Sequence, residues 1–180
     1  LRIKQQMDMD FQFRNDVTVD EYIEMIRLKT SVLLGGSMKI GSIIGGASES
    51  DQQAIYNFAI ALGISFQLWD DYLDTFGDSS KTGKQVGGDI LANKKTLLTI
   101  LAWENSNEDQ KKDAQFIWSL PASVEKIERT LAWYEATQAK QKTESVRDQY
   151  LDEALKELSW IEGDISLFKE MAHLFAHRDH

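Results

Sequence analysis

A short acidic segment is the part of this 180-residue sequence whose residue types and spacing could do chemistry. The stretch SFQLWDDYLDTFGD, residues 65–78, places Asp70, Asp71 and Asp74 directly after an apolar run. On a helix Asp70 and Asp74 project from one face with Asp71 one position round, and carboxylates this close repel unless a cation lies between them. Mg²⁺ takes one or two protein carboxylates and completes its shell with water and phosphate oxygens. The spacing predicts a magnesium site that a phosphate ligand completes.

A solvated helix end is the alternative interpretation of this cluster, because charged side chains usually face water. Two features favour the metal site. The acids abut the apolar run IALGISFQLW, and Gln67 lies one turn before Asp70 on the same face. A calcium loop of the EF-hand type fits poorly, since the D-x-D-x-D-G spacing and the terminal Glu are missing.

Basic residues elsewhere in the chain could bind the phosphate. Lys84 and Lys94 flank a glycine-containing stretch, GKQVGGDILANKK, whose backbone can approach an anion closely. Lys29 and Thr30 add a cation and a hydroxyl from within an apolar helix, where an unpaired lysine would cost free energy. Each alone is more often a surface residue. Together they indicate a cavity for a ligand with a diphosphate head and a hydrocarbon tail.

The elements that must position these residues are helices. Apolar residues recur at spacings of three and four, runs of alternating β-branched residues are scarce, and Pro121 is the single proline. The predicted fold class is all-α, with one helical domain over residues 1–180. Its size and 42% hydrophobic content suit one core.

Three local patterns refine this prediction. Thr18 is a plausible N-cap for the helix that leads to the RLKT sequence, and residues 51–76 have the apolar pattern of a buried bundle helix. Gly41 and Gly45 place small residues on one helical face, which indicates close helix packing or a kink. Residues 77–95 form one long irregular segment, and loops of this length are usually functional or disordered.

Composition excludes several classes of function. The net charge of −9, with Lys and Arg dispersed among more numerous acids, argues against a nucleic-acid partner. The absence of cysteine excludes thiol mechanisms. No apolar run is long enough for a transmembrane segment, so a cytoplasmic protein is the default expectation. His173 and His177 are four apart, but two histidines without a third ligand do not indicate zinc.

Four ordered motifs resemble those of the trans-isoprenyl diphosphate synthases, the polyprenyl synthetase family that includes farnesyl and geranylgeranyl diphosphate synthases. FQLWDDYLD resembles the family's second aspartate-rich motif, GKQVGGDI its following loop, NKKT the lysine that closes it, and RLKT its Lys-Thr helix. The resemblance implies the helical bundle of the isoprenoid synthase type and a likeness to the C-terminal half, or slightly more, of a usual member.

The resemblance implies roles for nine residues. Those that would help hold Mg²⁺ on an allylic diphosphate are Asp70, Asp71 and Asp74. Those that would contact the diphosphate, line the reacting centre or neutralise charge are Lys29, Thr30, Gln67, Lys84 and Lys94. Phe66 would lie by the isopentenyl substrate and the developing carbocation, with a core aromatic as the alternative. We assign no role to Trp69 or Lys95.

The implied reaction follows from charge. Ionising an allylic C–O bond releases diphosphate and leaves a delocalised cation, so metal ions and lysines must stabilise the departing oxygens while a dry pocket protects the cation. The double bond of isopentenyl diphosphate then attacks, and proton loss regenerates an alkene. The expected cofactor is Mg²⁺, the substrates are an allylic diphosphate and isopentenyl diphosphate, and the expected assembly is a homodimer.

The family's first aspartate-rich motif has no counterpart in residues 1–28, where MDMD contains two acids and no adjacent pair. KQQMDMDF resembles the element that follows that motif, so we expect an N-terminally truncated chain that is inactive alone. A non-catalytic regulatory or partner subunit of the same fold is the alternative. A terpene cyclase is a third, since cyclases commonly use an acidic motif without this pairing of Lys-Thr and glycine-lysine elements.

Overall fold

The computed structural model describes residue 7 and residues 9–77 and 87–176. These residues form helices and turns with no β-strand among them, which confirms the all-α prediction. In chain order the helices are α2 (Val19–Ile26), the π-helical turn η1 (Arg27–Ser31), α3 (Val32–Ile44), α4 (Glu49–Phe76), α6 (Gly88–Leu91), α7 (Leu97–Glu104), α8 (Glu108–Ser119), α9 (Val124–Ala136), α10 (Ala139–Glu157), the 3₁₀ turn η2 (Leu158–Trp160) and α11 (Ser166–Ala176).

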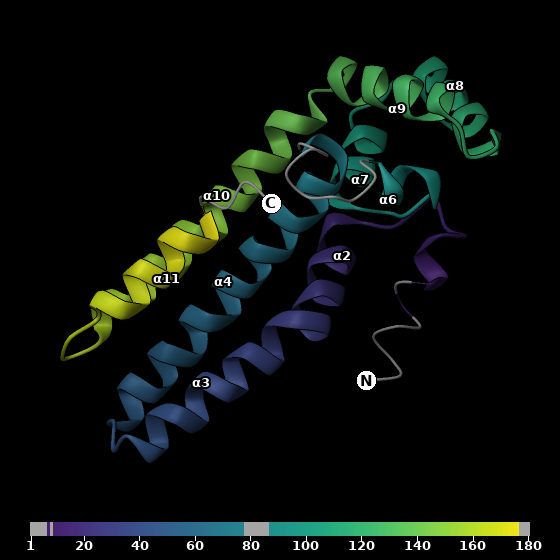
Figure 1. Cartoon of the computed structure of the whole chain (residues 1–180). Helices are drawn as coiled ribbons and strands as arrows, with labels where there is room; N and C mark the ends of the chain where they lie inside the picture. The colour runs from purple at the N-terminus through teal and green to yellow at the C-terminus, as the bar shows by residue number, and fades with distance from the viewer. Residues whose placement is uncertain (1–6, 8, 78–86, 177–180) are drawn as a thin grey trace.

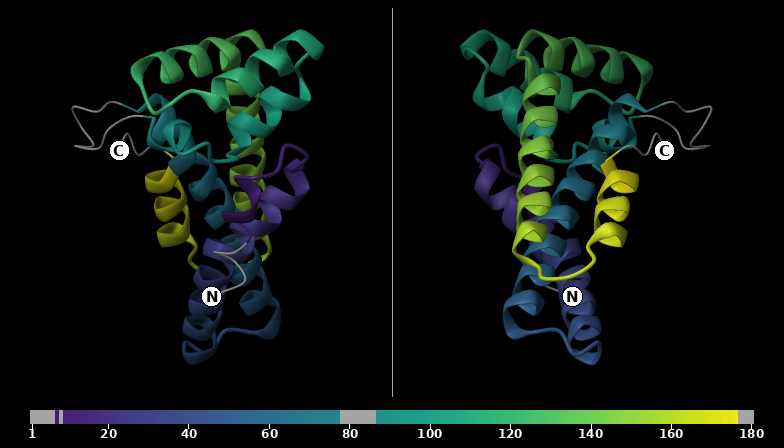
Figure 2. Two further views of the ribbon diagram at one scale, coloured as in Figure 1. Left: turned by 90° about the vertical axis from the view of Figure 1, so that its right-hand side faces the viewer. Right: turned by 90° about the vertical axis from the view of Figure 1, so that its left-hand side faces the viewer.

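Helix α4 is the central helix of the bundle. It packs against α3 along one side and against α10 and α11 along another, while α8 and α9 lie across one end of the bundle (Figure 1). The two side views show α10 and α11 as neighbouring rods joined by a turn at the opposite end (Figure 2). None of the described helices is both long enough and apolar enough to span a bilayer.

The core is divided into two clusters along α4. Near the start of the helix, Phe58 and Leu62 are fully buried together with Leu158 of η2. Towards its end, Leu68 is buried among side chains that include Leu97 and Leu98 of α7. The nearly unbroken apolar pattern of α4 follows from this, because helices cover it on several sides.

The predicted helix starts are confirmed with small shifts. Thr18 caps α2: its hydroxyl accepts the backbone N–H of Glu21, and the Glu21 carboxylate accepts the N–H of Thr18. The predicted helix at 51–76 begins two residues earlier, because Ser48 serves as the N-cap and accepts the N–H of Asp51. The contacts at Thr18 are reciprocal, whereas Ser48 accepts one N–H, and both caps satisfy N–H groups that are free in the first turn of a helix.

The close helix packing expected at Gly41 and Gly45 is not found among the described residues, and the alternative of a kink stays a prediction. A Cβ placed on Gly41 would meet no atom within 4 Å, and Gly45 is the C-cap of α3. The tight contact lies instead at Gly63 of α4, where a Cβ would come within 2.8 Å of the Ser31 Oγ and 2.9 Å of its Cα. Small residues on a helical face allow close approach, but only a facing helix decides which of them is used.

Candidate active site

The RLKT sequence lies in a π-helical turn between α2 and α3. η1 spans Arg27–Ser31, and Ser31 is buried where this turn approaches Gly63 of α4. A π-helical turn is a rare interruption that is frequently found at functional sites. Here it places Lys29 in an exposed position and directs the Thr30 hydroxyl towards α4.

A chain of hydrogen bonds links this turn to the aspartate-rich end of α4. The Thr30 hydroxyl donates to the Gln67 Oε1 at 3.0 Å, and the Gln67 side-chain amide donates to the Asp71 Oδ1 at 3.0 Å. The Tyr22 hydroxyl donates to the second oxygen of Asp71 at 2.5 Å. Because the amide of Gln67 is held from both sides, its oxygen has a defined orientation in the site.

The environment of Asp71 disfavours its charge. Burial is the largest cause and raises the pKa of this carboxyl to about 6, with a smaller upward contribution from Asp89. The hydrogen bonds from Tyr22 and Gln67 and the charge of Lys94 act in the opposite direction. These donors and Lys94 thus favour the ionised form of Asp71, which burial disfavours.

Asp70 and Asp74 lie in different surroundings from Asp71. The Asp70 side chain is exposed, whereas Asp74 is half-buried and accepts the backbone N–H of Asp89 at 2.8 Å. The backbone carbonyl of Asp74 also accepts the N–H of Gly87, whose φ of 86° lies in the left-handed region that favours glycine. The glycines of GKQVGGDI thus bring the start of α6 against the acidic end of α4.

The lysines of the site have separate positions. Lys94 forms an ion pair with Asp89, whose side chain is largely buried, so this cation is held close to the acids of α4. Lys29 is exposed on η1. Lys84 belongs to residues 78–86 and lies outside the part of the chain that the structure describes.

Phe66 faces α11. Its ring lies 5.0 Å, centroid to centroid, from the ring of Phe175. Phe66 precedes Gln67 on α4, but its ring contact is with α11, whereas the Gln67 amide bonds to Thr30 of η1. The ring contact fits the core-aromatic alternative, while a role beside the isopentenyl substrate stays a prediction.

The donor set at the end of α4 fits Mg²⁺. Asp70 and Asp74 are one turn apart and offer hard carboxylate oxygens of the number that this ion usually takes from a protein. Within residues 9–77 and 87–176 no group of three or more acidic, histidine or cysteine side chains is arranged to hold a metal. The carboxylate of Asp71 points to Tyr22 and Gln67, so its sharing of a metal with the other two stays a prediction.

Sequence reasoning missed two residues of this site. Tyr22 looked like one more apolar position of its helix, yet its hydroxyl bonds to Asp71 across 49 residues of sequence. The GGDI motif contains Asp89, to which the sequence alone assigns no role. In the structure the backbone N–H of Asp89 donates to the Asp74 carboxylate, and the Asp89 carboxylate forms an ion pair with Lys94. Its position directly after two glycines was a usable signal, whereas nothing local marked Tyr22.

The profile of the polyprenyl synthetase family matches residues 1–134, which is more than half of the chain. The chain belongs to this family. Geranylgeranyl pyrophosphate synthase of Geoglobus acetivorans is 37% identical over 176 residues, which are 97% of this chain and 53% of that protein. The short chain isoprenyl diphosphate synthase of Methanothermobacter thermautotrophicus is 41% identical over 108 residues, 60% of this chain and 33% of that protein.

Solved structures of this polyprenyl synthetase family share the fold. A crystal structure of a geranylgeranyl pyrophosphate synthase superposes with a TM-score of 0.87 at 36% identity, over 99% of this chain and 57% of that one. The geranylgeranyl pyrophosphate synthetase of Pyrococcus horikoshii superposes with a TM-score of 0.89 at 28% identity. The match covers 98% of this chain and 54% of that one. The chain thus spans about half the length of these synthases.

Proposed function

We propose that this chain is the diphosphate-binding part of a trans-prenyltransferase that condenses an allylic diphosphate with isopentenyl diphosphate. The observation that carries the proposal is the hydrogen-bond chain from Thr30 through Gln67 to Asp71. It connects the Lys-Thr turn to the aspartate-rich helix, so polar groups from both motifs converge. The names of the similar synthases support prenyl diphosphates as substrates and product.

The acidic and basic residues of the site would have different roles. When bound at the end of α4, Mg²⁺ would supply Lewis-acid stabilisation of the leaving diphosphate. Asp70 and Asp74 would hold it, with Asp71 as the third ligand that the family resemblance implies. Lys29, Lys84 and Lys94 would neutralise phosphate oxygens, and their fixed positive charge would favour departure of the diphosphate.

Thr30, Gln67 and Phe66 would act on the organic part of the substrate. The oriented oxygens of Thr30 and Gln67 present partial negative charge, which would stabilise a developing allylic cation. Phe66 would shield the isopentenyl substrate from water. These three roles rest on the family resemblance together with the hydrogen bond between Thr30 and Gln67.

We also infer that the 180 residues alone bind diphosphate without turnover. The chain contains one D-D-x-x-D sequence, and a single acidic helix cannot clamp a diphosphate from two sides during ionisation. A regulatory or partner subunit would share this inactivity, so a direct comparison is needed. The homodimer and the cytoplasmic location expected from the sequence remain predictions.

Turnover of labelled isopentenyl diphosphate with an allylic diphosphate separates these functions. The 180-residue chain should show none, whereas a fusion preceded by the N-terminal half of a homologous synthase should form a longer prenyl diphosphate. Within the active fusion, Asp70→Asn should lower kcat by orders of magnitude, since it removes a metal-binding charge at nearly constant volume. Turnover by the chain alone would refute the inferred inactivity, and a folded but inactive fusion would favour the regulatory subunit.

A further inference from the structure

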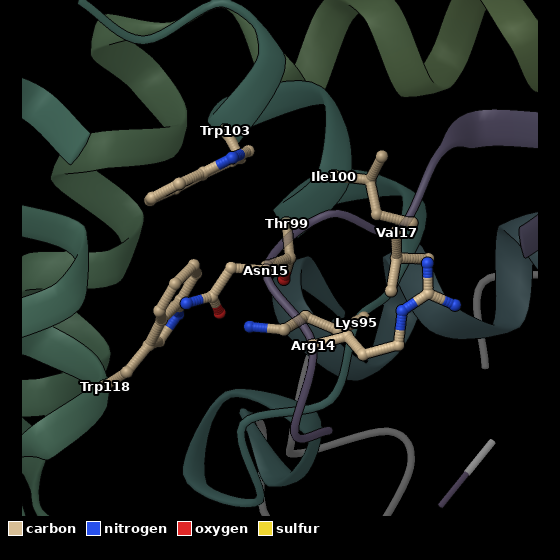
Figure 3. Close-up of a pocket in the computed structure, with 8 residues that line it drawn as sticks. All are labelled: Arg14, Asn15, Val17, Lys95, Thr99, Ile100, Trp103 and Trp118. Atoms are coloured by element: carbon tan, nitrogen blue, oxygen red, sulfur yellow. The ribbon is translucent and has the colours of Figure 1, made fainter. Parts of the chain in front are cut away.

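A small pocket lies away from the acidic end of α4, between the segment that precedes α2, the start of α7 and the end of α8. We call it the Lys95 pocket (Figure 3). Its lining residues are Arg14, Asn15, Val17, Lys95, Thr99, Ile100, Trp103 and Trp118. Its cavity volume is about 10 Å³. That is room for one water molecule or one small ion.

The ammonium group of Lys95 is the unusual feature of this pocket. Lys95 is 8% exposed, and its Nζ lies 3.4 Å from the centroid of the Trp118 ring. Within the described residues this Nζ has no hydrogen-bond acceptor and no carboxylate partner. A cation over an aromatic face gains some free energy, but the three N–H donors of this ammonium have no acceptor among the described residues and depend on what enters the pocket.

A second buried lysine shows how the fold normally satisfies such a group. Lys126 is 2% exposed, and its ammonium donates to the backbone carbonyl oxygens of Leu120 at 3.1 Å and Trp118 at 3.5 Å. In the part of the chain that the structure describes, Lys95 has no comparable carbonyl. Its neighbour Lys94 is paired with Asp89, so within these residues only one of the two adjacent lysines has an acidic partner.

The other polar groups of the pocket do not supply the missing negative charge. Arg14 is itself ion-paired with Asp16 at 2.8 Å and Glu21 at 2.9 Å, so those carboxylates are engaged outside the pocket. The Thr99 hydroxyl shares a hydrogen bond with the Tyr134 hydroxyl at 2.7 Å. Asn15, Lys95 and Trp118 all line the pocket (Figure 3).

We propose that the Lys95 pocket binds a small monovalent anion, of the size of chloride, at the Lys95 ammonium. One uncompensated positive charge matches one negative charge, and the volume excludes a diphosphate. The Asn15 amide can donate a second hydrogen bond to the same anion. This site is separate from the proposed substrate site, because Lys94 and not Lys95 faces the acids of α4.

Thermal unfolding of the 180-residue chain in sodium chloride or sodium gluconate of equal ionic strength tests this site. Gluconate is too large for the pocket, so chloride alone should stabilise the native state by binding to it. We expect the unfolding temperature to rise with the logarithm of the chloride concentration above its Kd, by about 3–6 °C when chloride is tenfold above that Kd. Equal unfolding temperatures in chloride and gluconate would overturn the proposal.

Two matched variants locate the effect. Lys95→Met keeps the length of the side chain but removes the charge, so the difference between chloride and gluconate should vanish. Lys126→Met removes the other buried lysine and should retain the difference even if it lowers both unfolding temperatures. A difference that survives Lys95→Met would refute the assignment to this pocket.

A spectroscopic measurement on the unsubstituted chain keeps the proposal testable if Lys95→Met does not fold. Chloride titration followed by ¹⁵N NMR of the lysine ammonium groups should shift the Lys95 signal saturably, while the Lys126 signal stays constant. Uniform drift of all lysine signals, or no shift at Lys95, would contradict a bound anion.

Discussion

At the scale of single residues, the three aspartates of the WDDYLD sequence have unlike surroundings. Asp70 is exposed, Asp74 accepts a backbone N–H, and Asp71 accepts hydrogen bonds from Tyr22 and Gln67. Equal spacing in a motif therefore does not mean equal chemistry. Burial disfavours the charge of Asp71, and the Tyr22 hydroxyl is one of the donors that favour it.

Tyr22→Phe should test that support. Removing the hydroxyl leaves one Asp71 oxygen without a donor, so the free energy of unfolding should fall by about 1–3 kcal/mol. The pKa of Asp71 should rise above its value of about 6, because a group that stabilises the charged form is lost. Urea unfolding measures the first effect, and carboxyl NMR titration the second.

Tyr56→Phe is the control for this substitution. The Tyr56 ring lies under Lys39 at 5.5 Å, and no hydrogen bond of its hydroxyl is found among the described residues. Its loss should leave stability nearly unchanged. If the two variants unfold alike, the contact between Tyr22 and Asp71 does not support the charged carboxylate.

Lys95 gives a prediction for stability against pH. Burial lowers the pKa of its ammonium from 10.5 to about 8. Between these values the unfolded chain binds more protons than the native chain, so the free energy of unfolding should increase as pH rises through this window. For one proton the slope is at most about 1.4 kcal/mol per pH unit.

The measurement compares the chain with Lys95→Met from pH 8 to about pH 9.5, in buffer without chloride. Only the unsubstituted chain should show this increase in unfolding free energy with pH, because methionine has no ionisable proton. Parallel stability curves for the two proteins would show that the Lys95 ammonium is not desolvated in the native state.

At the scale of elements, the contact between η1 and α4 decides whether Thr30 can reach Gln67. Glycine inside a helix usually costs about 0.5–1 kcal/mol relative to alanine, yet α4 keeps Gly63 at this contact. A Cβ there would lie 2.9 Å from the Ser31 Cα, a backbone atom that can move only if η1 moves. The contact between η1 and α4 therefore requires a residue without a Cβ at position 63, one turn before Gln67.

Gly63→Ala should reverse the usual effect of alanine in a helix. Overpacking against η1 should lower the free energy of unfolding by about 1–3 kcal/mol and lengthen the distance between Thr30 and Gln67. Gly36→Ala in α3 is the matched control, because a Cβ there meets nothing within 4 Å, and it should stabilise the chain by about 0.5–1 kcal/mol. Denaturant unfolding of both variants measures these changes in unfolding free energy. A Gly63→Ala variant that is more stable than the unsubstituted chain would contradict the close contact with η1.

At the scale of the whole molecule, one long helix joins the core to the site. The apolar side chains of α4 hold α3, α10 and α11 together, and its last turns carry the acids. The residues of α4 that determine stability should consequently differ from those that bind ligand. Substitutions in its middle should change folding, whereas substitutions at its acidic end should change binding.

Calorimetry on the 180-residue chain should reveal this separation. Mg²⁺ alone should bind weakly, since the protein offers few carboxylates, and it should bind much more tightly with an allylic diphosphate. Asp70→Asn should weaken the combined binding at least tenfold with little change in stability. Tight Mg²⁺ binding without phosphate, or diphosphate binding that ignores Mg²⁺, would contradict the assigned roles.

Leu62→Ala is the counterpart in the core. Leu62 is fully buried, so a cavity there should cost about 2–5 kcal/mol of unfolding free energy. The folded fraction of this variant should bind the diphosphate and Mg²⁺ normally. An Asp70→Asn chain as destabilised as Leu62→Ala would show that the acids serve the fold.

The sequence by itself determined the helical class, the start of α2 at Thr18 and the segment that carries the acids. These depend on local capping groups and on a repeat of apolar residues that any helix of this kind must show. The four ordered motifs also indicated the family that the comparisons confirm. Only the tertiary structure decided that RLKTS forms a π-helical turn, that Gly63 and not Gly41 makes the close contact, and that Lys95 has no acidic partner among the described residues. Such features depend on which side chains meet across distant parts of the chain, and no local pattern encodes those meetings.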